Sequence, residues 1–135
     1  MSGICPEGLT QKSFNILVKC CKWAEAYSID QLLDQAGDHL EMVRTAHMDN
    51  VYVNIKLAEQ VFNNFKSVAT KWDQIPQHCH PWLQGMMRYF CLTSDLESDF
   101  TSPIGFDDDV EIMNACLRFA DLEELCINPE DFDDV

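Results

Sequence analysis

The residues best suited to chemistry lie in one acidic stretch, residues 94–111, which reads SDLESDFTSPIGFDDDVE. This stretch holds seven carboxylates around one proline and one glycine. Carboxylate oxygens suit hard divalent cations such as Mg²⁺, Ca²⁺ and Mn²⁺. One interpretation is therefore a divalent-metal-dependent hydrolase that uses a carboxylate cluster. Its candidate metal ligands are Asp95, Asp99, Asp108 and Asp109.

The spacing of these carboxylates excludes an EF-hand loop, which needs glycine at its sixth position and glutamate at its twelfth. A loop starting at Asp95 has Phe100 and Phe106 there, and a loop starting at Asp107 has Ile112 at the sixth position. A diphosphate-binding Mg²⁺ site would need a second acidic motif, for which residues 30–41 are a candidate. The carboxylates of that segment lie opposite its apolar stripe, which is typical of a solvated helix face.

The same acidic residues also have a purely structural interpretation. Aspartates at the start of a helix accept hydrogen bonds from its free N–H groups and complement its dipole. Others can organise a turn through bonds from side chain to backbone. We therefore interpret the stretch first as a capped turn and second as an acidic contact surface. The residues of that surface would be Asp95, Glu97, Asp99, Asp107, Asp108, Asp109 and Glu111.

A family resemblance rests on the same stretch. Its residues run Asp95-Leu96-x-x-Asp99-Phe100, then Gly105, then Asp108-Asp109, with Tyr89 upstream. This order resembles the signature of the YkvA-like family, small helical domains of unknown function. The resemblance covers residues 82–120 and implies a helical hairpin there, but it implies no reaction. The sequence departs from the family pattern at Glu97, Ser98, Ser102 and Asp107.

Histidines and cysteines supply two further candidate constellations. His78, Cys79 and His80 are ligand types that suit zinc, but three ligands this close in a loop cannot easily face one ion. His39 and His47 lie eight residues apart on one helix, and we expect both on the surface. A nucleophilic Cys79–His80 pair would need an orienting carboxylate and an oxyanion hole, neither of which the sequence indicates. Phosphate loops and the common hydrolase motifs are absent from the sequence.

The composition limits the class of partner. The chain has 135 residues and a net charge of −14, and its length fits one domain. Such a charge repels nucleic acid and anionic membranes, and it favours a basic protein partner or divalent cations. Binding is favoured over catalysis, and no cofactor is predicted beyond a divalent cation. A further alternative is an acidic inhibitor or immunity-type protein that mimics the charge of nucleic acid.

The cysteines and the apolar runs predict a cytoplasmic protein without a membrane span. The seven cysteines are an odd number, and no secretory signal is recognisable at the N-terminus, MSGICPEGLTQK. Free cysteines in apolar helical patterns are typical of a reducing compartment. No run approaches the roughly 20 apolar residues of a transmembrane helix. We therefore expect a soluble, cytoplasmic chain.

The apolar spacing is helical almost throughout and predicts an all-α, single-domain bundle of about five helices. We expect helices at residues 10–27, 28–43, 51–72, 82–92 and 110–126, between an N-terminal segment (1–9) and an acidic tail (128–135). Ser28 and Gln31 have capping-box spacing, and residues 73–81 break the pattern. The third helix carries an a/d seam that indicates packing within the bundle or a homodimer through Val51–Trp72. The aromatic residues expected in the core are Trp23, Trp72, Trp82 and Phe90.

Overall fold

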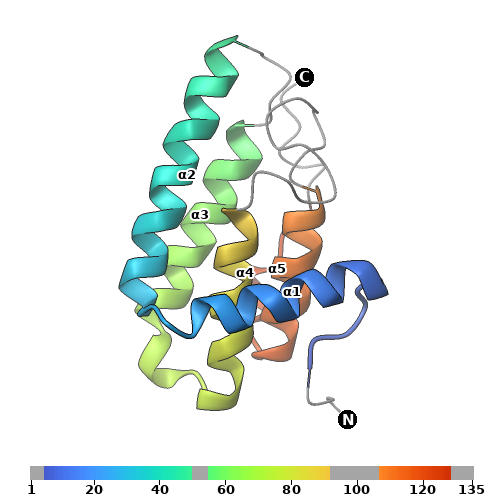
Figure 1. Cartoon of the computed structure of the whole chain (residues 1–135). Coiled ribbons are helices and arrows are strands. Elements are labelled where there is room, and N and C mark those ends of the chain that lie inside the picture. The colour runs from blue at the N-terminus through green and yellow to red at the C-terminus, as the bar shows by residue number, and fades with distance from the viewer. Residues whose placement is uncertain (1–4, 50–54, 92–106, 129–135) are drawn as a thin grey trace.

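The computed structural model describes residues 5–49, 55–91 and 107–128, and these form an all-α bundle (Figure 1). The predicted fold class is therefore confirmed. The described part of the chain contains no strand, and none of its helices is both long and apolar enough to cross a membrane. The five helices are α1 (Gln11–Ala24), α2 (Ile29–Asp49), α3 (Ile55–Thr70), α4 (His80–Phe90) and α5 (Asp107–Phe119).

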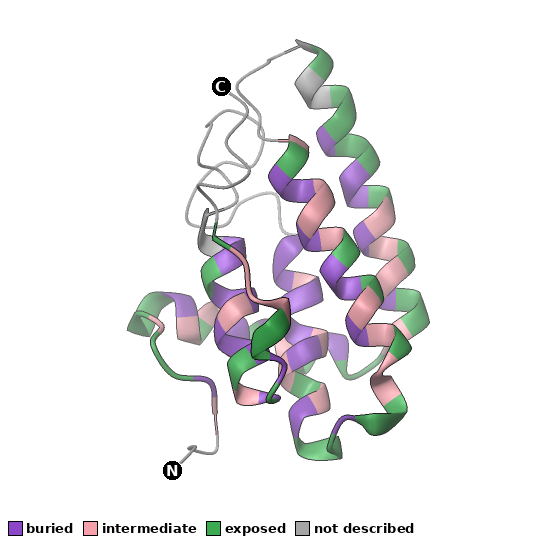
Figure 2. Ribbon diagram, turned by 180° about the vertical axis from the view of Figure 1, so that it is seen from behind, coloured by how far each residue is buried: buried purple, intermediate pink, exposed green. Residues whose placement is uncertain are grey.

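The fourth helix lies at the centre of the bundle. It packs against α1, α2 and α5, while α2 and α3 run side by side and α1 lies across α4 and α5 (Figure 1). The buried faces of the helices turn toward one another in the interior (Figure 2). Since α4 has neighbours on several sides, more than half of its residues are buried. These buried residues are Leu83, Gly85, Met86, Met87, Tyr89 and Phe90.

The predicted capping box of the second helix is confirmed, and the first helix also begins at a side-chain cap. Thr10 caps α1, where its hydroxyl accepts a hydrogen bond from the Ser13 N–H. Ser28 and Gln31 form the expected capping box before α2: the Gln31 N–H donates to the Ser28 hydroxyl, and the Ser28 N–H donates to the Gln31 side chain. The first helix ends at Ala24, three residues earlier than expected, because the chain must turn here into α2.

The break between the third and fourth helices is also confirmed. Two 3₁₀ turns, Trp72–Gln74 and Gln77–Cys79, occupy it, and Pro81 lies in the first turn of α4. The buried face of α3 includes Leu57, Val61 and Asn64, in addition to residues of the predicted seam. Ala58 and Phe65 belong to that seam and are buried, as expected for packing between helices of one chain. The homodimer remains a prediction.

The fifth helix ends at Phe119, so its predicted extension to Cys126 is wrong. The reason is a Schellman motif, in which the Leu122 N–H donates to the Leu117 carbonyl and the Asp121 N–H donates to the Arg118 carbonyl. Asp121 occupies the left-handed position of this motif, with φ at 63°. The chain therefore turns back here instead of continuing as a helix.

We expect Asp121→Gly to raise the free energy of unfolding by about 1 kcal/mol, because glycine adopts the left-handed conformation without a Cβ clash. Urea unfolding measures the change. Asp121→Ala is the control, since it removes the same charge but keeps a Cβ, and it should destabilise the chain. If both variants shifted stability in the same direction, the effect would come from the lost charge and not from the backbone.

Two asparagines hold the segment after α5 against the bundle. The Asn114 side chain donates to the Ile127 carbonyl (2.8 Å) and accepts from the Ile127 N–H (3.1 Å). Asn64 of α3 donates to the Leu125 carbonyl at 2.7 Å. These bonds satisfy backbone groups that no helix or strand would pair. The segment 121–127 therefore belongs to the folded unit and lies against α3 and α5.

Candidate functional site

The predicted acidic surface lies largely outside the residues that the structure describes. Asp95, Glu97 and Asp99 lie outside the described residues. The backbone of Asp107 and Asp108 begins α5, but their side chains are not described. The two remaining members differ sharply in exposure. Asp109 is only 4% exposed, whereas Glu111 is exposed. These two carboxylates therefore do not share a solvent-facing surface, and the surface as a whole remains a prediction.

The described residues contain no group of three or more histidine, cysteine, aspartate or glutamate side chains placed to hold a metal ion. His80, a candidate zinc ligand, has a structural role instead. Its ring stacks on Trp72 with centroids 3.9 Å apart, and its Nε2 lies 3.0 Å from the Ile75 carbonyl and 3.2 Å from the Trp72 carbonyl. Carbonyls only accept, so Nε2 carries the proton and donates to them.

The imidazole next to Cys79 is that of His78 and not that of His80. The Cys79 Sγ lies 3.5 Å from His78 Nε2, but the cysteine is buried and His78 is exposed. Burial raises the pKa of the Cys79 thiol, which favours the unreactive protonated form. This arrangement does not make a nucleophile.

The expectation that His39 is a surface histidine is wrong. His39 is 4% exposed, and its ring meets Phe90 edge-on with centroids 5.0 Å apart. Burial lowers the pKa of His39 to about 4, because desolvation disfavours the imidazolium. The side chain of His47 is not described, so a zinc site that combines the two histidines is untested. His39 itself packs as a neutral core residue.

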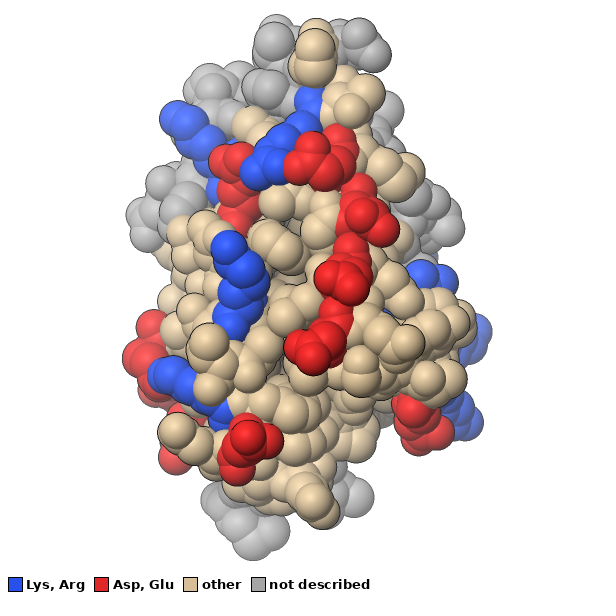
Figure 3. Space-filling view, turned by 90° about the vertical axis from the view of Figure 1, so that its left-hand side faces the viewer, with Lys and Arg blue, Asp and Glu red and all other residues tan. Residues whose placement is uncertain are grey.

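An exposed row of carboxylates follows α2, and we call it the α2 carboxylate row. Successive members stand three or four residues apart, so they share one face of the helix. The row is visible on the α2 side of the molecule in Figure 3, where basic side chains lie across a hollow from it. Within this row, only Glu41 forms an ion pair with a described residue. The row consists of Asp30, Asp34, Asp38 and Glu41.

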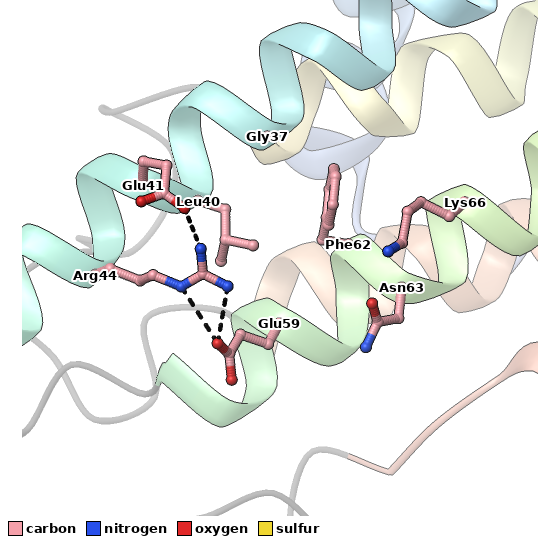
Figure 4. Close-up of a pocket in the computed structure, with 8 residues that line it drawn as sticks. All are labelled: Gly37, Leu40, Glu41, Arg44, Glu59, Phe62, Asn63 and Lys66. Carbon is pink, nitrogen blue, oxygen red and sulfur yellow. Dashed lines mark hydrogen bonds and ion pairs between the residues drawn. The ribbon is translucent and has the colours of Figure 1, made fainter.

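A hollow of about 370 Å³ lies between α2 and α3 (Figure 4). Arg44 bridges the two helices across it, since its guanidinium pairs with Glu41 on α2 and with Glu59 on α3 at 3.0 Å. Lys66 lies over the Phe62 ring, 5.4 Å from the centroid. The guanidinium is thus already paired with two carboxylates inside the protein. We therefore interpret the ion pairs at this hollow as a structural link between α2 and α3.

A second hollow, of about 300 Å³, lies where α1, α2 and α4 meet, and we call it the Trp23 hollow. Trp23 and Met42 line it and are 36% and 53% exposed. Asp38 and Arg88 also line it, and neither forms an ion pair with any described residue. This hollow therefore combines exposed apolar surface with charges that the described part of the chain leaves unpaired.

Trp23 is held in a fixed position although it is not in the core, which corrects our expectation. Tyr27 stacks on the indole with centroids 4.4 Å apart, and the Arg88 guanidinium lies 3.8 Å from its centroid. These two contacts restrict the indole, which nevertheless stays 36% exposed. The sequence placed Trp23 on a helical stripe, but the buried face of α1 runs through Leu17, Cys20 and Ala24.

Comparison with known proteins does not assign this chain to a family. No family model matches the sequence, and neither a curated protein nor a solved structure shows significant similarity to it.

Proposed function

We propose that this chain is a small helical binding module that recognises a basic protein partner through exposed carboxylates. The observation that carries this proposal is the α2 carboxylate row, in which Asp30, Asp34 and Asp38 have no ion-pair partner among the described residues. The net charge of −14 supports the same class of partner, because it attracts basic proteins over long distances. The carboxylates of the acidic stretch 94–111, apart from the buried Asp109, are a second candidate contact surface in this proposal.

The proposal includes a reducing, cytoplasmic setting, which the seven free cysteines support. Burial raises the pKa of Cys20 to about 11 and that of Cys21 to about 12, so these thiols stay protonated. The resemblance to the YkvA-like family is part of the same proposal. Packing of α4 against α5 supports the implied hairpin at residues 82–120. No specific observation among the described residues favours the hydrolase or the inhibitor interpretation.

We expect the affinity for a basic peptide to fall by about tenfold or more between about 0.01 M and about 0.15 M salt, because ions screen exposed charges. The probe is a lysine-rich peptide of about 18 residues, long enough to follow α2 as a helix. Fluorescence anisotropy of the labelled peptide measures binding. An affinity that does not change with salt would contradict the proposal.

A charge-matched pair of variants tests the location of the contact. The triple variant Asp30→Asn, Asp34→Asn and Asp38→Asn should weaken the low-salt affinity by about tenfold. The control removes three exposed charges elsewhere and should have a much smaller effect, although the net charge changes equally. If the two triple variants bound equally well, attraction would be diffuse and α2 would not be the contact surface. The control changes are Glu7→Gln, Asp73→Asn and Glu123→Gln.

A further inference from the structure

We infer that the Trp23 hollow receives an apolar side chain of a basic helical segment, while cations of that segment lie along the α2 carboxylate row. This inference rests on the proposed function and names the kind of partner. Its starting point is the exposure of Met42 and Trp23 in one hollow. Tryptophan, methionine and arginine are among the side chains enriched where proteins bind one another.

The two hollows beside α2 differ in a way that selects this one. In the α2–α3 hollow, Arg44 already pairs with carboxylates on both helices. In the Trp23 hollow, Asp38 and Arg88 both line the wall, but no ion pair joins them. A partner can therefore place a cation at Asp38, and the N–H groups of Arg88 can donate to the free carbonyls at the C-terminal end of the partner's helix.

The geometry of α2 favours a helical segment over a compact ligand. Asp30, Asp34 and Asp38 repeat every four residues, a spacing of about 6 Å along the helix axis. A partner helix with basic residues every four positions has the same repeat, so it can pair with all three carboxylates when it lies along α2. A small molecule in a hollow of about 300 Å³ would reach Asp38 but not the two more distant aspartates.

The rigidity of the hollow also suits an apolar anchor. The indole of Trp23 contacts both Tyr27 and Arg88, so less side-chain freedom remains to be lost on binding. Met42 also lines the hollow, and its flexible, polarisable side chain can adapt to side chains of different shape. An apolar residue that enters the hollow would contact both exposed side chains.

Two labelled peptides of equal charge test the inference. In the first, leucines form one face of a lysine-rich helix; in the second, each leucine is replaced by glutamine. We expect the leucine peptide to bind more tightly, and we expect Met42→Gln to weaken it by about fivefold to tenfold. The affinity of the glutamine peptide should not change. Met48→Gln is the matched control, since Met48 lies on the same helix, is 84% exposed and does not line the hollow.

Each result has a distinct meaning. If both peptides bound equally and Met42→Gln changed neither affinity, the hollow inference would be overturned while the charge-based function stood. If neither peptide bound at low salt, the basic-partner function itself would fail. If Met42→Gln instead abolished self-association of the chain, measured by analytical ultracentrifugation, a second copy would be the occupant and the inference would be wrong.

Discussion

Replacing Gly85 with alanine is expected to lower the free energy of unfolding by about 3 kcal/mol, because α1 and α4 touch backbone to backbone at this position. A Cβ on residue 85 would overlap the Cys21 Sγ and would lie 3.1 Å from the Cys21 nitrogen and 3.2 Å from its Cα. The sulfur can rotate away, but the backbone of α1 can move only if the two helices separate. Urea unfolding followed by circular dichroism measures the loss.

Gly37→Ala is the matched control for this prediction. Gly37 also lies within a helix, but an added Cβ would stand 3.6 Å from Phe62 Cζ, an ordinary van der Waals contact. The substitution should therefore stabilise the chain by about 1 kcal/mol through helix propensity alone. If Gly85→Ala stabilised the chain as much as Gly37→Ala, the close approach of the two helices would be refuted.

A double variant separates the sulfur from the backbone part of the clash. Cys21→Ala removes the Sγ that a Cβ at residue 85 would overlap, but it leaves the backbone of α1 in place. We expect Gly85→Ala to lower the free energy of unfolding less in the Cys21→Ala background than in the unaltered chain. The expected coupling between the two substitutions is about 1 kcal/mol. Additive effects would mean that the backbone contact alone causes the loss.

These two glycines show what the sequence could and could not predict. The periodicity of apolar residues predicted the helices, and Ser28 with Gln31 predicted where α2 begins, because capping is local chemistry. Gly37 stands inside a helical pattern, where a glycine can mark a kink or close packing, yet α2 is continuous there. The close approach is at Gly85, and nothing local marks it. It depends on α1 crossing α4, which is a property of the tertiary arrangement.

The candidate site has the same division. The spacing of Asp30, Asp34 and Asp38 correctly indicated one exposed helix face, since this follows from the helical repeat. The exposure of Trp23 and the burial of His39 were not predicted, because each depends on how a neighbouring helix is rotated. Tryptophan is apolar and histidine is polar, so residue type suggested the core for Trp23 and the surface for His39, and both expectations were wrong. Only the packing of α1 and α2 around α4 reverses both assignments.

Acidification is expected to destabilise the chain through His39. Its pKa is about 4 in the folded chain, where burial disfavours the charged ring, and 6.5 is the ordinary value for a solvated histidine. Above the ordinary value the ring is neutral in both states, so its titration has no effect on stability. As the pH falls toward 4, the unfolded chain binds a proton that the folded chain does not, and this favours unfolding. The contribution lost by about pH 4 is roughly 3 kcal/mol.

The free energy of unfolding, measured by urea at several values between about pH 7 and about pH 4, tests this expectation. Carboxylates also titrate over this range, so the informative quantity is the difference between the unaltered chain and a variant. His39→Gln should flatten the pH dependence, even if the variant is less stable at neutral pH. His78→Gln removes an exposed histidine and should leave the slope unchanged. Equal slopes for all three proteins would mean that His39 is not held neutral by burial, and that acid sensitivity arises from the carboxylates instead.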